Sequence, residues 1–378
     1  MKLKIIHLVL GKANPERMNG VNKVAYQLVS KQLSLAYDVC LWGIATTLIH
    51  NYPPRDFATK LFQQHKNKLK LDADLVTALK GLPKESIVHL HGAFIPEFYL
   101  VSRYLKRLGI PYVYTPHGSL TEMAMTKNAW VKKIYFSCFE SKLIRDAKWV
   151  QLLGINEFDY LDELTLSANK CLIPNGQDLS DIPRQVEPVI TSTPRKPIFG
   201  FCGRLASFHK GLDLMLQGFH TYRLQGGKGQ LEFIGDGADR PKLEQLCHEL
   251  ELTDAVTFHG KKFGKEKFDL LARMDIFLHT SRMEGFPTAV LEAAAMEKPT
   301  ITSDATNINS FVDQYRSGYT LRENTPSEIA QSMQVMAKHF YRNTLSLMGK
   351  RGRSMVVAEF DWHTIAERLV KTYVQQPK

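Results

Sequence analysis

No stretch of this sequence approaches the run of about 20 apolar residues that a helix needs to cross a bilayer. The apolar start, Lys2 to Gly11, contains His7 and lacks the small-residue cleavage site of a signal peptide, so we expect a buried first strand there. The five cysteines are scattered and form no CxxC pair, which indicates packed thiols in a reducing compartment. We therefore expect a cytoplasmic protein, with the inner face of the membrane as a second candidate location.

Several catalytic motifs are also missing. Gly235-Asp236-Gly237 lacks the third glycine of a GxGxxG fingerprint, because Arg240 takes its place. GK[ST], HExxH and GxSxG do not occur, which argues against P-loop, zinc-protease and serine-hydrolase chemistry. Asp72-Ala73-Asp74 has the DxD form of a metal site but lies in a lysine-rich helical stretch, so we expect a solvated face and no bound metal.

Positive charge is concentrated in the first part of the chain. Residues 1–150 contain 22 Lys and Arg against 10 Asp and Glu, whereas the remainder is close to neutral. A positive field of this kind favours an anionic partner. A nucleic-acid-binding protein is one alternative, but no recognisable reader motif is interleaved with the basic residues, so we expect no nucleic acid partner.

Short apolar runs alternate with helical patterns, which favours parallel sheets with helices on both faces. Strands are expected at 4–10, 38–44, 86–91, 112–116, 149–153 and 170–173, then at 198–202, 230–234, 256–259, 276–280, 300–303 and 318–321. The proline-rich segment 188–197 separates the two series as a linker. The sequence thus predicts an α/β protein of two doubly wound, Rossmann-like domains facing a cleft: residues 1–187, with the helix at 361–378 packing back on them, and residues 188–360.

One loop in the second half combines two glutamates with glycine and proline. Glu284-Gly285-Phe286-Pro287-Thr288 follows the strand at 276–280 and opens a helix, since proline suits the first helical position. Free N–H groups at this helix start would suit a diphosphate. Glu292 follows about 7.5 Å along the helix axis, where a carboxylate could bind a ribose diol. Taken alone, the pair would be explained by a capped helix with one solvated glutamate and a second glutamate in the loop.

Two cations flank a glycine turn at another strand end. Gly203-Arg204 follows the strand at 198–202, and Lys210-Gly211 precedes the next helix. Because parallel strands end at one edge of their sheet, we expect both cations near the same anion site. Each would by itself be explained as a surface charge, but together they favour neutralisation of a diphosphate.

In order and spacing these segments resemble glycosyltransferase family 4, a family of retaining enzymes with the GT-B architecture. Through most of residues 198–300 the resemblance rests on Gly203-Arg204-Leu205, Lys210-Gly211, Ile234-Gly235-Asp236-Gly237, Phe258-His259-Gly260, Glu284-Gly285-Phe286-Pro287 and Leu291-Glu292. The first half resembles the family through Asn19-Gly20-Val21, Thr115-Pro116-His117-Gly118 and Pro174-Asn175-Gly176-Gln177-Asp178. The family often has a double glycine where this chain has Asn19-Gly20.

The resemblance implies a role for each matching residue. Arg204 and Lys210 would bind the diphosphate, and Glu292 the ribose hydroxyls. Glu284 and the backbone amides of Gly285, Phe286 and Pro287 would meet the sugar, with Thr288 beside them. Gly20 would let the backbone approach the phosphates, and His117 would bond a donor-sugar hydroxyl or act at the reacting region. Glu284 and His117 are therefore the candidate catalytic residues, the others are donor-binding, and no metal or cofactor is implied.

The activity that the resemblance implies is transfer of a hexose with retention of configuration. The donor would be a nucleotide-diphosphate sugar, UDP favoured over GDP, and the acceptor a hydroxyl of a glycan or lipid-linked acceptor in bacterial surface polysaccharide or lipopolysaccharide synthesis. Residues 1–187 would take the acceptor side and residues 188–360 the donor. No well-placed carboxylate pair of the glycosidase kind is present. A nucleotide-sugar epimerase of the same architecture is the alternative enzyme.

Residues 127–148 have the pattern of a basic amphipathic helix. The apolar members are Trp130, Ile134, Tyr135, Cys138 and Phe139, and the cations are Lys132, Lys133, Lys142, Arg145 and Lys148. Such a helix suits the surface of an anionic membrane. A helix whose apolar stripe packs on the sheet explains the pattern equally well, so both interpretations stay open.

Overall fold

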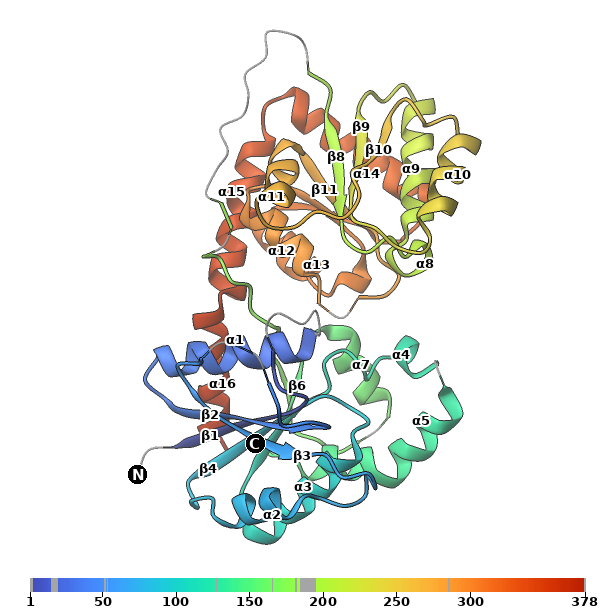
Figure 1. The fold of residues 1–378 in the computed structure, drawn as a ribbon. Helices are drawn as coiled ribbons and strands as arrows, with labels where there is room; N and C mark the ends of the chain where they lie inside the picture. Colours follow the sequence, from blue (N-terminus) through green and yellow to red (C-terminus); the bar gives the residue numbers. More distant parts are fainter. Residues whose placement is uncertain are drawn as a thin grey trace. The chain divides into compact units, whose positions relative to one another are not determined.

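Figure 1 shows the computed structural model, which describes residues 3–14, 20–50, 52, 54–126, 128–164, 166–180, 182–183, 195–284 and 286–376. The chain divides into two compact units, Met1–Gly176 with Trp362–Lys378 and Gln177–Asp361. The division comes before the predicted boundary at residue 187, because Leu179 and Ile182 already pack in the core of the second unit. The C-terminal helix belongs to the first unit, as expected, and most of the predicted linker lies outside the described residues.

The first unit is built on a seven-stranded parallel sheet of order β3-β2-β1-β4-β5-β6-β7. Its strands are β1 (Lys4–Leu10), β2 (Asp38–Ala45), β3 (Ala58–Gln63), β4 (Ser86–His91), β5 (Tyr112–Thr115), β6 (Trp149–Leu152) and β7 (Lys170–Leu172). Its helical segments are α1 (Gly20–Ser34), α2 (Ala73–Lys80), α3 (Pro96–Leu108), α4 (Glu122–Thr126), α5 (Ala129–Tyr135), η1 (Phe136–Glu140), α6 (Ser141–Asp146), α7 (Ile155–Glu163) and α16 (Trp362–Val374).

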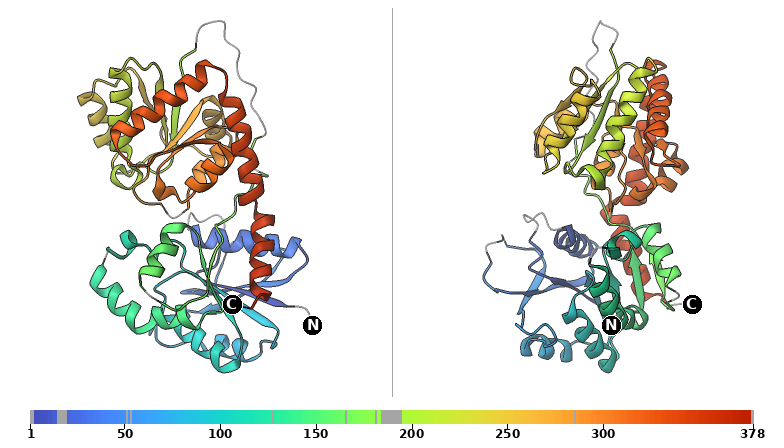
Figure 2. Two further views of the ribbon diagram at one scale, coloured as in Figure 1. Left: turned by 180° about the vertical axis from the view of Figure 1, so that it is seen from behind. Right: turned by 90° about the vertical axis from the view of Figure 1, so that its right-hand side faces the viewer.

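Both faces of this sheet are covered, as Figures 1 and 2 show. Successive residues of a strand point to opposite faces, so Ile6 and Leu8 of β1 join the core under α2 and α3, while Ile5 and Val9 join the core under α1 and α16. The six predicted strands are present to within a residue at their ends. Strand β3 was not predicted, because this short edge strand buries few of its side chains and shows little apolar pattern.

The second unit is built on a six-stranded parallel sheet of order β10-β9-β8-β11-β12-β13. Its strands are β8 (Ile198–Cys202), β9 (Gln230–Ile234), β10 (Val256–Phe258), β11 (Ile276–His279), β12 (Thr300–Thr302) and β13 (Gly318–Thr320). Its helical segments are α8 (Ser207–Lys210), α9 (Leu212–Leu224), α10 (Arg240–Glu249), α11 (Gly264–Arg273), α12 (Thr288–Ala295), η2 (Asp304–Thr306), α13 (Asn309–Tyr315), α14 (Pro326–Tyr341), α15 (Leu345–Met355) and η3 (Val356–Phe360).

Two apolar clusters again flank the sheet, one with α9, α10 and α14 and the other with α11, α12, α13 and α15. All six strands predicted for this half are present, which confirms the doubly wound pattern. Within the described residues, no helix of either unit is both long and apolar enough to span a bilayer.

Candidate active site

The strand order of the second unit brings two predicted loops together. Strands β8, β9 and β10 succeed one another toward one edge of the sheet, and β11 returns to pair with β8 on its other side. Ligands of doubly wound sheets bind at such a reversal, beyond the carboxyl ends of the strands. The loop after β8 carries Arg204, helix α8 that follows it ends at Lys210, and the loop after β11 carries Glu284.

Gly211 fixes the position of Lys210. Helix α8 ends there with a left-handed φ of 60°, and a Cβ added at this position would lie 2.0 Å from the Thr280 carbonyl oxygen. Only glycine allows so close an approach in that conformation. The backbone N–H groups of Arg282 and Met283 also donate to the His209 carbonyl, which holds α8 against the loop after β11.

Glu284 is the centre of a small ionised cluster. Its Oε2 atom pairs with the Lys210 ammonium and lies 2.7 Å from His279 Nε2. Burial opposes ionisation of this carboxyl, but the His279 hydrogen bond and the Lys210 charge outweigh it and lower the pKa of Glu284 to about 2. No described residue bonds the Oε1 atom, so the carboxylate is anchored through one oxygen and offers the other.

His279 was not among the predicted site residues. It is the last residue of β11, buried and stacked on Phe201 with ring centroids 5.6 Å apart. Burial lowers the pKa of His279 despite the adjacent carboxylate, so we infer a neutral ring that donates from Nε2 to Glu284. A histidine at a strand end, directly before the loop of interest, was the available sequence signal.

Glu292 also has a partner that the sequence did not indicate. Both of its carboxylate oxygens lie 2.9 Å from Lys267 Nζ on α11. Both side chains are mostly buried, with 16% and 18% exposed. Glu292 is the fifth residue of α12, as expected, although the helix begins at Thr288 with Pro287 as its N-cap rather than at Pro287.

The start of α12 corrects part of the prediction. Pro287 has no N–H, so it cannot donate to a sugar, and the Thr288 N–H already donates to the Phe286 carbonyl over 3.0 Å. The Phe286 ring is half-buried near Phe360, with ring centroids 6.2 Å apart. Gly285 lies outside the described residues. The Thr288 side chain is exposed.

Arg204 follows β8 and is exposed. Within the described ranges of the chain, its guanidinium group has no ion-pair or hydrogen-bond partner. The structure thus joins Lys210 to Glu284, two residues that the prediction assigned to different parts of the donor, and leaves Arg204 unneutralised.

In the first unit, His117 follows β5 in a left-handed conformation with φ of 54°. That conformation is costly for a non-glycine residue, so the surrounding structure must hold the backbone in it. Its Nε2 atom lies 3.1 Å from His91 Nδ1. Gly20 opens α1 and is exposed, and a Cβ added there would meet no atom within 4 Å, so packing in the described residues does not require glycine.

A cavity of about 400 Å³ opens in the first unit where β1 and β2 end. Its lining includes Lys12, Asn14, Asn22, Thr46 and Gln64. Its size and its convergent polar groups are typical of sites for small polar ligands.

Comparison with known proteins identifies a family and several curated relatives. Residues 196–339 match the family described as Glycosyl transferases group 1. A GDP-mannose-dependent alpha-mannosyltransferase of Mycobacterium tuberculosis is 27% identical over 183 residues, 47% of this chain and 43% of the relative. A putative colanic acid biosynthesis glycosyltransferase, WcaL of Escherichia coli, is 27% identical over 166 residues, 42% of this chain and 41% of the relative. The matched segments span less than half of these relatives.

Solved structures match both units. Sucrose-phosphate synthase from Thermosynechococcus elongatus has a TM-score of 0.72 and 20% identity over 98% of each chain. Anabaena HepE in complex with UDP has a TM-score of 0.72 and 16% identity over 98% of this chain and 99% of its own. These likenesses confirm the predicted two-domain α/β fold of the GT-B class.

Proposed function

We propose that the chain is a retaining hexosyltransferase, because residues 196–339 match the family described as Glycosyl transferases group 1. It moves a hexose from a nucleoside-diphosphate sugar to a hydroxyl of a glycan or lipid-linked acceptor, in bacterial surface polysaccharide or lipopolysaccharide synthesis. The observation that carries the proposal is the cluster of Lys210, Glu284 and His279 at the strand-order reversal of the second sheet, with the unpaired Arg204 on the neighbouring loop.

The diphosphate is the first group that this arrangement suits. An ammonium has three N–H donors, and Lys210 uses one on Glu284, so two remain for phosphate oxygens. Arg204 adds a planar set of donors. When the bond between the anomeric carbon and phosphate breaks, negative charge builds on the leaving diphosphate. Cations already held in position stabilise that charge without reorganising.

The two carboxylates suit the hydroxyl groups of the donor. Glu284 is held through Oε2 and accepts a hexose hydroxyl at Oε1, while its low pKa keeps it ionised as an acceptor. Glu292, held by Lys267, keeps further lone pairs for a ribose diol. In this proposal the acceptor hydroxyl attacks the face from which the diphosphate leaves, and the leaving diphosphate takes up the hydroxyl proton. The new glycosidic bond replaces the sugar–phosphate bond on the same face, so the anomeric configuration is retained. No metal ion takes part in these roles.

For the nucleotide, we favour uridine over guanosine. HepE has been solved with UDP and with UDP-glucose. The M. tuberculosis relative is named as GDP-mannose-dependent, which keeps guanosine as the second candidate. The acceptor enters at the first unit, where the polar cavity beside β1 and β2 is a candidate binding place.

Thermal-shift titration with UDP and GDP tests the donor assignment, since a ligand at 100 times its Kd stabilises by about 2.7 kcal/mol. Arg204→Ala should abolish most of the shift and slow transfer roughly 100-fold, on the scale of one lost preorganised donor. Lys265→Ala is the matched control, because Lys265 is exposed and lies in the same unit. Equal shifts in both variants would refute the site. Sugar appearing on a second molecule distinguishes transfer from epimerisation.

We also propose that the first unit contacts anionic membrane through the segment from α5 to α6. The predicted apolar stripe is divided: Tyr135 and Phe139 turn inward, with rings near Phe94 and Tyr99. Trp130 and Ile134 remain 79% and 51% exposed, joined by Val131 at 71%. Isolated apolar residues are common on surfaces, but three large ones in five positions form a patch.

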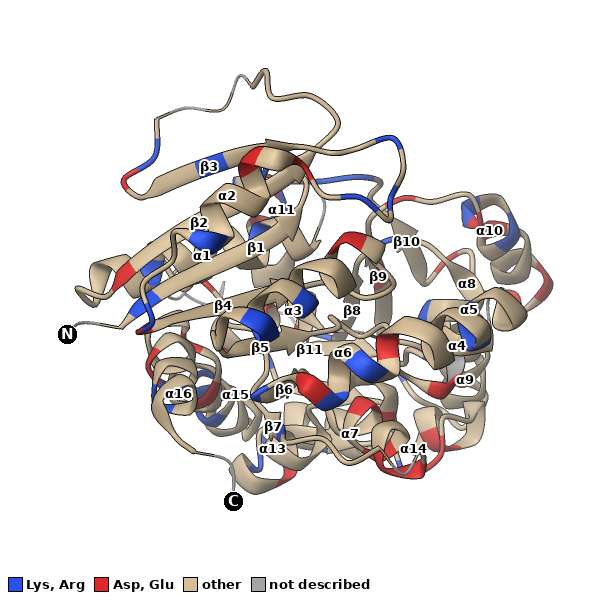
Figure 3. Ribbon diagram, turned by 90° about the horizontal axis from the view of Figure 1, so that it is seen from below, with Lys and Arg blue, Asp and Glu red and all other residues tan. Residues whose placement is uncertain are grey.

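The basic residues of this segment are likewise divided. Lys132 donates to the Ala124 carbonyl and Lys148 to that of Tyr373. Lys133, Lys142 and Arg145 are exposed, and Figure 3 colours the Lys and Arg positions of this region blue. Each cation near an anionic surface contributes about 1 kcal/mol.

Vesicle co-sedimentation tests the contact. The chain should pellet with anionic but not zwitterionic vesicles at low salt, and should stay in solution when Lys133, Lys142 and Arg145 become Glu. The same change at Lys261, Lys262 and Lys265 of the second unit is the control. If the protein stays in solution with anionic vesicles at low salt, the patch does not bind membrane. The location in the cell stays a prediction.

A further inference from the structure

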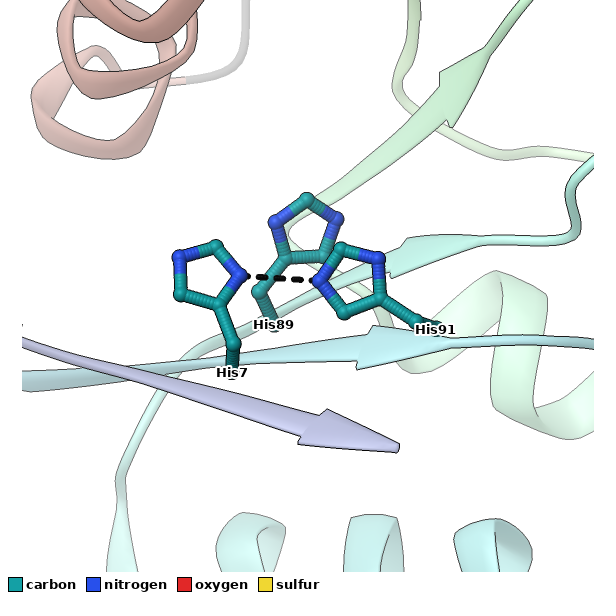
Figure 4. Close-up of side chains that lie close together, drawn as sticks. All are labelled: His7, His89 and His91. Carbon is teal, nitrogen blue, oxygen red and sulfur yellow. Dashed lines mark hydrogen bonds between the residues drawn. The ribbon is translucent and has the colours of Figure 1, made fainter. Parts of the chain in front are cut away.

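A stripe of polar side chains crosses the buried face of the first sheet that lies under α1 and α16. His7 of β1 stands opposite His89 of β4 in the strand register, and His91 follows two residues later on the same face. All three are at most 1% exposed, and Figure 4 shows their rings grouped together. Buried polar groups in an apolar core require partners, so each ring nitrogen has to be accounted for.

The three histidines have ring nitrogens within 4.8 Å of one another, which would allow a metal ion between them. A metal ligand must offer a bare nitrogen, however, and here every ring nitrogen already faces a hydrogen-bond partner. His7 Nδ1 and His91 Nε2, 2.8 Å apart, must share one proton. The cluster is therefore a hydrogen-bonded network, and its direction can be derived.

One branch starts from a group that can only accept. The Ile173 carbonyl accepts from Gln151 Nε2 at 2.9 Å, which turns Gln151 Oε1 toward the Thr115 hydroxyl, 2.8 Å away. Thr115 must donate there, so it accepts from His89 Nε2 at 2.6 Å. His89 Nδ1 is then bare and accepts from the Tyr373 hydroxyl, also at 2.6 Å. The Tyr373 oxygen is left able only to accept.

Gln32 starts a second branch. Its Oε1 atom lies 2.8 Å from His7 Nε2, and an amide oxygen can only accept a hydrogen bond. The Gln32 Nε2 atom has no hydrogen-bond partner among the described residues. His7 therefore carries its proton on Nε2.

The second branch runs from His7 to His117. With its proton on Nε2, neutral His7 has a bare Nδ1, which accepts from His91 Nε2. His91 Nδ1 is then bare and accepts from His117 Nε2 at 3.1 Å. Burial lowers the pKa of His7 and of His117 to about 4, so the rings are neutral at physiological pH. No described residue bonds the remaining nitrogen, His117 Nδ1.

We propose that Gln32, His7 and His91 are positioning residues that hold His117 in the tautomer with a bare Nδ1, so that His117 accepts a hydrogen bond from a sugar hydroxyl. A bare nitrogen and a phosphate oxygen are both acceptors and repel, so His117 selects the hexose and not the diphosphate. The choice of a sugar hydroxyl as ligand rests on the proposed function, whereas the tautomer does not.

Nuclear magnetic resonance of the ¹⁵N-labelled full chain tests the tautomer directly, because bare and protonated ring nitrogens have well-separated shifts. The His117 signals are assigned by their loss in His117→Gln. We expect a protonated Nε2 and a bare Nδ1 at neutral pH. A proton on Nδ1, or a charged ring, would overturn the proposal whether or not the protein transfers sugar.

Gln32→Leu removes the acceptor that sets the direction, and Gln27→Leu, on the same helix, is the matched control. In Gln32→Leu we expect a mixture of His117 tautomers. We also expect kcat/KM for the sugar donor to fall 3- to 10-fold, which corresponds to the loss of one neutral hydrogen bond. The affinity for UDP should be unchanged. Equal loss of UDP affinity would indicate a merely structural role. If the wild-type protein has the expected His117 tautomer but transfers no sugar, the hydrogen-bond network is supported and the proposed function is refuted.

Discussion

Breaking the ion pair between Lys210 and Glu284 should destabilise the second unit by a measurable amount. The two side chains are 17% and 12% exposed, so each charge has lost most of its water. Removing one partner of a buried pair leaves an uncompensated charge and costs about 3–5 kcal/mol. We expect about 3 kcal/mol for Lys210→Ala, the lower end of that range, because His279 still hydrogen-bonds Glu284.

The pKa of Glu284 gives a second estimate. It falls from 4.5 to about 2 in the folded protein, which corresponds to about 3 kcal/mol of stability at neutral pH. Because the folded pKa is the lower one, this contribution is fully present above pH 4.5 and is lost as the pH falls toward 2. Acidification from pH 6 to pH 3 should therefore remove about 2 kcal/mol from the wild-type unit, and less from Glu284→Gln.

Hydrogen exchange followed by mass spectrometry on peptides from β8 and β11 measures the stability of this unit. All four tryptophans lie in the first unit, so tryptophan fluorescence reports separately on that unit. The double variant Lys210→Ala/Glu284→Gln should be more stable than the sum of the single changes predicts, by about 2 kcal/mol. Lys265→Ala, which breaks an exposed pair with Asp269, should cost less than 1 kcal/mol. A coupling energy below about 0.5 kcal/mol would refute the buried-pair argument.

Three further outcomes are expected. Gly211→Ala should destabilise the second unit by at least 2 kcal/mol more than Gly226→Ala in hydrogen exchange, because both have left-handed φ values but only the first Cβ meets a carbonyl, that of Thr280. Lys267→Met should weaken nucleotide binding in calorimetry, while Lys265→Met should not, because only Lys267 holds Glu292. The fresh product should show the donor's anomeric configuration by nuclear magnetic resonance and should form in the presence of a chelator; an inverted product would contradict the proposed mechanism.

The sequence by itself determined the strands and the loops that carry chemistry. Apolar runs of strand length and the glycines and prolines that follow them are local signals, so β1, β4, β8 and β11 could be placed within a residue of their observed ends. Two motifs are local signals as well. One is a strand followed by a glycine turn and a cation, and the other is a strand followed by a glutamate and the start of a helix. They carried the resemblance to glycosyltransferase family 4, and the solved structures confirm the GT-B fold that this resemblance implies.

The sequence signals for secondary structure and for helix faces were weaker where an element is only partly buried. Strand β3 lies at a sheet edge and shows little apolar alternation, so nothing in its sequence distinguished it from a loop. Within the segment from α5 to α6, the periodicity did not reveal that Tyr135 turns inward while Val131 stays outside. Which side of a helix is covered depends on its neighbours, and a helical repeat alone does not name them.

Only the tertiary structure decided which charged and polar groups are partners. Lys210 and Glu284 are 74 residues apart in sequence, and His7 and His91 are 84 apart. They meet because β11 returns to lie beside β8, and β4 to lie beside β1, and this strand order is set by how the helices pack on the two faces of each sheet. Residue types along one segment give the chemistry that each side chain can perform, but the hydrogen bonds that fix its charge and its tautomer come from segments that the sheet brings alongside.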